Sequence, residues 1–143
     1  MAATQIKMGF EGIIYTGSPG STASGQALNT RDVKITLDPQ MGDTTARGDS
    51  SVPPIETEQV STMKWSATVT MLRDLADSQV NTLMSAAAAC TPVALRMIDH
   101  LSGQGFDGDC NVKVEQGIPL KGEQTVDFTF TPNRKYRTPQ LYV

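Results

Sequence analysis

The sequence contains few residues whose types and spacing could support catalysis. His100 is the single histidine, so a serine–histidine or cysteine–histidine pair would have to use it. One histidine cannot supply a multi-histidine metal site. It follows an apolar segment and stands beside Asp99 at an expected turn, which favours a surface or strand-end position. We therefore expect no catalytic role for His100.

The thiols and carboxylates show no arrangement typical of a metal site. Cys90 and Cys110 have no metal-ligand spacing, and we expect both to be reduced, buried or half-buried thiols. Asp99, Asp107 and Asp109 could in principle bind calcium, but their spacing does not match the EF-hand pattern. A solvated turn is the favoured interpretation, and no metal or cofactor is expected.

Two short motifs have simple structural explanations. Residues 103–108 (Gly-Gln-Gly-Phe-Asp-Gly) fit the G-x-G-x-x-G pattern of dinucleotide sites. That site requires a helix directly after the glycines, whereas the following residues alternate like a strand, so we expect a hairpin turn. The tripeptide Arg47-Gly48-Asp49, known from cell-adhesion ligands, is expected to be part of a loop.

Length and charge limit the classes of function. The chain has 143 residues and a net charge of −3, which suits one domain over residues 1–143 and argues against tight binding of phosphates. Hydrophobic residues make up 38% and charged residues 19%, which suggests a core stabilised partly by neighbouring molecules. No signal peptide and no membrane insertion are expected.

Alternation of apolar and polar residues predicts most of the secondary structure. The clearest strands are 32–38, 61–72 and 123–131, and a helix capped by Asp77 or Ser78 is expected to end at Thr91-Pro92. The other expected strands are 6–15, 93–98 and 109–115, with turns at 103–108 and 117–122. Three segments without such patterns are expected to be a flexible arm (17–28), a long loop (39–60) and an extended C-terminal arm (132–143).

These elements give the expected fold class. It is mainly β: an antiparallel β-sandwich or barrel-forming sheet with one flanking α-helix and long extended arms. The helix can cover one face of the sheet. The other face is polar and is expected to be exposed to solvent or to serve another function.

The order of several segments resembles the major tail tube protein of tailed bacteriophages over roughly residues 8–131. A Gly-rich arm leads into the strand Asn29–Ile35, and the loop Asp43-Thr-Thr-Ala-Arg47 precedes the strand Lys64-Trp65-Ser-Ala-Thr-Val-Thr70. A helix rich in Leu and Ala, the strand at Pro92–Leu95 and the segment Gly117–Phe130 follow. The Asp-Thr-Thr-x-Arg loop followed by the Trp strand is the most specific part.

The resemblance implies two packed antiparallel sheets with a flanking helix, and rings, commonly of six subunits, stacked into a hollow tube. One sheet of each subunit would join a continuous β-barrel around the channel. Under this hypothesis the polar strand faces line the channel, through Lys34, Thr36, Lys64, Ser66, Thr68, Thr70, Thr125, Asp127 and Thr129. Subunit contacts are expected at Asp43, Thr44, Thr45, Arg47, Asp49, Tyr136, Leu141 and Tyr142.

The same resemblance implies a non-enzymatic role in the virion tail. The tube would conduct DNA into the host without binding it tightly, because a Ser- and Thr-rich lining makes few phosphate contacts. The implied partners are further copies of the chain, a tape measure protein, a tail terminator and baseplate or tip proteins, with synthesis in the bacterial cytoplasm. The alternative is a β-sandwich decoration or host-attachment module, although one Trp and three Tyr provide few aromatic residues for such a site. A small enzyme is the third and weakest hypothesis.

Overall fold

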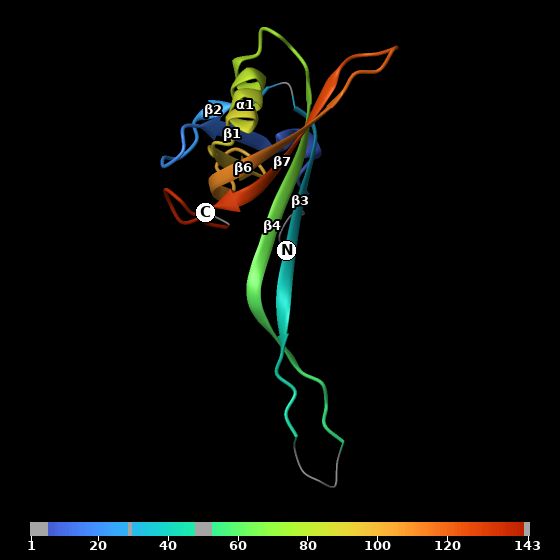
Figure 1. The fold of residues 1–143 in the computed structure, drawn as a ribbon, viewed down its shortest axis with the longest axis vertical. Coiled ribbons are helices and arrows are strands. Elements are labelled where there is room, and N and C mark those ends of the chain that lie inside the picture. Colours follow the sequence, from blue (N-terminus) through green and yellow to red (C-terminus); the bar gives the residue numbers. More distant parts are fainter. Residues whose placement is uncertain (1–5, 29, 48–52, 142–143) are drawn as a thin grey trace, which may run out of the picture.

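A computed structural model of the chain describes residues 6–28, 30–47 and 53–141 (Figure 1). Within these residues a short 3₁₀ turn, η1 (Gly9–Glu11), precedes strands β1 (Ile13–Gly17), β2 (Gly25–Gln26), β3 (Thr30–Asp43) and β4 (Glu58–Leu72). Helix α1 (Ser78–Ala89) follows, and then β5 (Val93–Ile98), β6 (Gly105–Gly117) and β7 (Thr125–Asn133). The mainly β fold with one flanking helix is confirmed.

The strands of the described residues form one sheet of seven strands in the order β2-β1-β5-β6-β7-β4-β3, and each neighbouring pair is antiparallel. The resemblance implies two packed sheets instead. The difference arises in β6, which pairs with β5 from Gly105 to Cys110 and with β7 from Asp109 to Gly117. A single long strand therefore belongs to two parts of the sheet.

We call these parts the short-strand half (β2, β1, β5 and Gly105–Cys110 of β6) and the long-strand half (Asn111–Gly117 of β6, β7, β4 and β3). The ring of Trp65 on β4 stacks on Phe106 of β6, with centroids 3.9 Å apart and planes at 10°. Strands two positions apart in a flat sheet are separated by about 9.5 Å. The stacking therefore requires the sheet to curl over itself, which encloses a core as a sandwich does.

The core lies between the two halves and α1. Alternate residues of β4 and β7 are fully buried, with exposed fractions of 1% or less at Val69, Met71, Val126 and Phe128. Val80, Leu83 and Ala86 of α1 pack against them. The Asp77 side chain caps the helix by accepting a hydrogen bond from the Gln79 N–H at 2.9 Å. The predicted start is confirmed, and Cys90 ends the helix in the left-handed region (φ 56°).

The segment at residues 17–28 was expected to be a flexible arm. Most of it is exposed, but it is anchored to the subunit at several positions. Gly25–Gln26 form β2, and Ala23 and Ala27 are only 5% and 8% exposed. Small side chains allow this close packing: a Cβ on Gly25 would lie 2.6 Å from Nε2 of Gln79. The small residues that suggested flexibility are those that let the chain approach α1.

The predicted loop at 39–60 is shorter than expected. β3 continues to Asp43 and β4 begins at Glu58, so both ends of this segment extend a long hairpin that projects away from the core in Figure 1. Pro39 lies inside β3, which is an edge strand, and edge strands tolerate proline. The polar composition of this segment reflects the lack of a core beneath it.

Two further predictions are corrected. Gly105–Gly108 is not a turn but the start of β6, where a Cβ on Gly105 would lie 1.7 Å from the Met97 carbonyl oxygen; the glycine allows close strand contact. The C-terminal segment is not an extended arm: Pro132 and Asn133 belong to β7, and the backbones of Asp107 and Gln140 exchange hydrogen bonds of 2.9 and 2.8 Å. The tail therefore folds back on its own subunit.

Candidate functional site: a polar sheet face and two free strand edges

The long-strand half carries the residues predicted to line a channel on one face. The ladder places Lys34 opposite Thr68, Thr68 opposite Thr129 and Thr129 opposite Lys113. Such rows run across all four strands of the long-strand half, so residues far apart in sequence become neighbours on this face. The predicted set is all solvent-accessible: Lys34, Thr36, Lys64 and Thr68 are exposed, and Ser66, Thr70, Thr125, Asp127 and Thr129 are half-buried.

Hydroxyl groups dominate this face, but it also carries both signs of charge. Thr70 donates a hydrogen bond to Asp127 Oδ1 at 2.7 Å, which fixes the position of this carboxylate on the polar face. Lys64 lies opposite Asp38, and Asp32 opposite Thr70. Along the registers, Asp32, Asp127 and Glu115 share one row across the strands, and Lys34 and Lys113 lie at the two ends of the next row. The sign of the charge therefore changes from row to row along these strands.

The predicted lining set omits further residues of the same face. By register they include Asp32, Asp38, Asn111, Lys113, Glu115 and Thr131. Lys113 Nζ lies 3.5 Å from Glu115 Oε1 in an exposed ion pair. A signal was available, because the alternation of Val112 and Val114 already places Lys113 and Glu115 on the polar side.

The opposite face of β3 is unexpectedly exposed. Val33, Ile35 and Leu37 share the apolar side, yet they are 44%, 49% and 39% exposed. They line one wall of an open groove of ≈ 930 Å³ that also involves Trp65 and Phe106. The alternation predicted for this strand is therefore correct, but its apolar side is not buried, since no residue of β3 is buried in the free subunit.

Two strand edges of the long-strand half are free. Within the part of the chain that the structure describes, β3 pairs only with β4, and β6 has no partner beside Asn111–Gly117 other than β7. Free edges expose unpaired N–H and C=O groups and can pair with another chain. These two edges lie at opposite sides of the polar face.

The predicted subunit contacts lie in separate places. Asp43, Thr44, Thr45 and Arg47 lie at the far end of the hairpin, and Asp49 and Tyr142 lie outside the described residues. The pKa of Asp43 is lowered by hydrogen bonds from the backbone and hydroxyl of Thr45. Tyr136 is 54% exposed, whereas Leu141 packs against the core of its own subunit. The structure thus does not bring the tail and the hairpin tip together.

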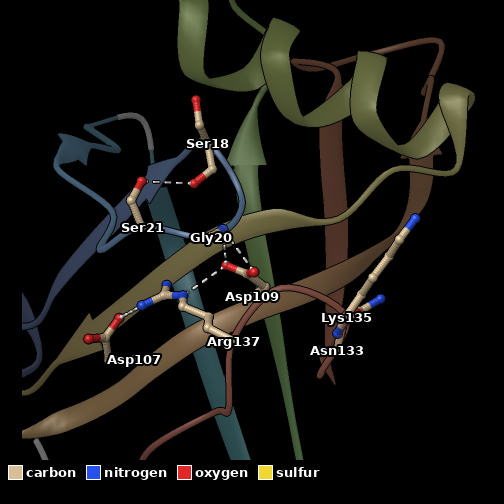
Figure 2. A network of polar contacts seen from close by, with 8 residues as sticks. All are labelled: Ser18, Gly20, Ser21, Asp107, Asp109, Asn133, Lys135 and Arg137. Carbon is tan, nitrogen blue, oxygen red and sulfur yellow. Dashed lines mark hydrogen bonds and ion pairs between the residues drawn. The ribbon is translucent and has the colours of Figure 1, made fainter.

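A buried ion-pair cluster holds the two chain segments that were expected to be free (Figure 2). Asp109 is 0% exposed and accepts hydrogen bonds from the Gly20 N–H (2.9 Å) and from Arg137 Nε (2.9 Å). Arg137 also contacts Asp107 at 2.8 Å. Burial alone would lower the pKa of Arg137, but its bonds to Asp109 and Asp107 outweigh it and raise that pKa.

The other candidate residues have structural roles. Asp107 and Asp109 bind Arg137, and Asp99 lies 2.6 Å from His100 Nδ1. Cys90 is exposed and Cys110 buried, both unpaired; Cys90 therefore departs from the predicted burial. The glycines at 105 and 108 lie in β6. No helix among the described residues has the length and apolar character needed to span a bilayer.

Comparison with known proteins finds the fold in phage-like tails. One chain of the virion of a native gene transfer agent (GTA) particle is 8% identical, with a TM-score of 0.73 over 96% of this chain and 100% of that one. A chain of the tail of the empty GTA particle, refined with C6 helical symmetry, gives 10% identity and a TM-score of 0.67 over the same shares. A chain of the SPP1 tail tube gives 10% identity and a TM-score of 0.73, over 96% of this chain and 79% of that one.

No family model matches the sequence, and no curated protein matches it either. The likeness is therefore one of structure. The chain has a tail tube protein fold, as predicted from the order of its segments.

Proposed function

We propose that this chain is a structural subunit that polymerises into stacked rings, of six subunits by analogy with the C6 tail, to form the hollow tube of a phage-type tail. The observation that carries the proposal is the long-strand half: a polar, accessible face bounded by a free edge on each side. Joining such edges around a circle closes a barrel and removes the exposed edges. The fold shared with tail and tail tube chains supports the same reading.

In this proposal the polar face becomes the channel wall. Its interspersed Lys, Asp and Glu side chains and its many hydroxyls allow DNA to pass without tight binding, because affinity for DNA rises with each phosphate that a cation neutralises. The subunit acts in the virion tail after synthesis in the host cytoplasm. Its partners are further copies, a tape measure protein, a tail terminator and baseplate or tip proteins. No catalytic role is proposed.

Negative-stain electron microscopy of the purified chain tests this function. We expect rings or tubes with a central channel, in a concentration-dependent equilibrium with monomers. A preparation that stays monomeric at all concentrations, in low and high salt, would instead favour the decoration or attachment module. The predicted wall is tested separately by the lysine substitutions described below.

A further inference from the structure

We propose that β3 residues Asp32–Asp38 of one copy pair antiparallel with β6 residues Asn111–Gly117 of the next copy, with Lys34 opposite Glu115. This inference rests on the proposed function, because it specifies the joint between neighbouring subunits of a ring. Alternating strand directions across β3, β4, β7 and β6 make the joint antiparallel, like the ladders inside the subunit.

The two free edges match in length. On β3, the ladder is irregular between Thr30 and Asp32, and Pro39 has no N–H to donate, so the regular edge runs from Asp32 to Asp38. On β6, the edge becomes free after Cys110, which pairs with Val93, and the strand ends at Gly117. End-to-end antiparallel alignment places Asp32 opposite Gly117 and Asp38 opposite Asn111, which sets the proposed register.

The backbone of β3 points the right way for this joint. Successive residues of a strand direct their N–H and C=O groups to opposite sides. The Thr44 N–H donates to the Thr57 carbonyl at 3.0 Å, so even-numbered residues of β3 face β4 and odd-numbered ones face outward. Pro39 agrees with this phase, since a proline fits where its missing N–H would point away from the partner strand.

The same alternation continues to β6. The Arg73 N–H, just beyond β4, donates to the Gln124 carbonyl at 3.1 Å, so odd-numbered residues of β4 bond to β7. Following the registers through β7 leaves the even-numbered residues of β6 facing outward. Val112 and Val114 can therefore exchange backbone hydrogen bonds with Leu37 and Ile35 of the neighbouring copy.

The side chains favour this register over its neighbours. It places Lys34 opposite Glu115 on the polar face, and Ile35 opposite Val114 and Leu37 opposite Val112 on the apolar face. The last two pairs would cover Ile35 and Leu37, which are 49% and 39% exposed in the free subunit. Opposite charges and apolar pairs directly across an antiparallel joint stabilise it.

Shifting the joint by two residues weakens these contacts. In one direction Lys34 meets Lys113 and Asp32 meets Glu115, and like charges directly opposite destabilise a ladder. That shift also continues the straight rows of the subunit, whereas a closed barrel needs a stagger between its strands. In the other direction the Lys34–Glu115 pair is exchanged for Asp38 opposite Lys113, but Ile35 meets Gln116, so one of the two apolar pairs is lost.

Disulfide trapping tests the register in assembled protein. The background is Cys90→Ser, because Cys90 is exposed whereas Cys110 is buried. Thr36 and Lys113 would form a non-hydrogen-bonded pair with Cα atoms about 4.5 Å apart, within the range for a disulfide. We expect T36C/K113C to give covalent multimers on mild oxidation, at least about tenfold faster than K34C/K113C or D38C/K113C, whose diagonal distances are about 7–8 Å. Each single cysteine variant serves as a control.

The outcomes separate the two proposals. If rings or tubes form but cross-link fastest through K34C/K113C or D38C/K113C, the proposed register is wrong and the proposed function stands. The same conclusion follows if rings or tubes form and none of the three pairs cross-links. A C90S parent that forms neither rings nor tubes overturns the function and the joint with it. Charge reversal gives a second measurement: K34E and E115K should each raise the concentration needed for assembly, and the double variant should restore it. No restoration would contradict the Lys34–Glu115 contact.

Discussion

At the scale of single residues, Asp109 joins parts of the chain that the sequence keeps far apart. Asp109 lies where β6 changes partner from β5 to β7. Its backbone is opposite Ala94 of β5 on one side and Asn133 of β7 on the other. Through Gly20 and Arg137 it also holds both flanking segments. Nothing in the local sequence distinguished it from a solvated aspartate, because burial depends on a tail that returns from 28 residues away.

Replacing Asp109 by Asn should destabilise the subunit by about 3 kcal/mol, because it leaves the half-buried Arg137 without one of its charged partners. Urea unfolding monitored by circular dichroism measures the change. Asp38→Asn, on an exposed part of β3, should change stability by no more than about 0.5 kcal/mol. Trypsin should also cleave the D109N variant faster at Arg137. Equal stability of the two variants would contradict the role assigned to the cluster.

The two thiols should differ sharply in reactivity. Burial raises the pKa of Cys110, so this thiol stays protonated at neutral pH, and the thiolate is the reactive form. Iodoacetamide at pH 8 should modify Cys90 alone in the folded chain and both cysteines in denaturant, as read by mass spectrometry. In the C90S variant the folded chain should remain unmodified. Labelling of Cys110 at the rate of a free thiol would show that the core opens there.

At the scale of elements, patterns based on alternation were reliable and patterns based on composition were not. The strand at 61–72 and the helix starting after Asp77 were predicted, because their apolar periods match the face they bury. Residues 17–28 and 39–60 look alike in their small and polar residues, yet the first packs against α1 and the second extends a hairpin. Whether such a segment packs or projects depends on whether the core lies beneath it. The position of the core is set by distant parts of the chain and cannot be read from the residues of the segment itself.

The candidate site was predictable to the same extent. The polar face was visible in the alternation around Trp65 and Phe128, whereas the free edges follow from the partner switch in β6. That switch depends on strand pairing between distant segments. Gly105 and Gly108, which allow close approach of Met97 and Pro139 to β6, resemble turn residues in the sequence.

Shortening the hairpin should separate folding from assembly. Replacing residues 45–56 by a short Gly-Ser turn removes the tip but keeps β3 and β4 within their ladder, which ends at the Asp43–Glu58 pair. We expect the variant to unfold within about 1 kcal/mol of the parent, since loop-length changes cost little. Because the hairpin projects away from the core (Figure 1), we propose that its tip contacts the next ring of the tube, and we expect the shortened variant to form rings that do not stack into long tubes. Electron microscopy with urea unfolding checks both. Tubes of normal length would contradict a role for the tip between rings.

At the scale of the whole molecule, the DNA affinity of the proposed channel wall should be tunable without altering the fold. Thr68 and Thr129 lie in one row between Lys34 and Lys113. Tubes of a T68K/T129K variant should retain double-stranded DNA at low salt and release it as salt rises, because each added phosphate contact steepens the salt dependence. Filter binding measures this. The matched control is a lysine pair at Leu75 and Leu101, which are exposed outside the polar face. Equal DNA retention by the control would contradict the wall assignment.

The two unlike edges of the long-strand half have a consequence for mixtures of subunits. In the proposed ring the edge on β3 meets the edge on β6 of the next copy. A copy with one damaged edge can then still be recruited through its intact edge, and it blocks further growth there. Such a copy is a chain terminator, and a ring is lost if any of its members is defective. When a β6-edge variant is mixed with normal protein, inhibition of assembly should therefore rise much faster than the fraction of variant in the mixture. The steepness of that rise would give the number of subunits in the ring.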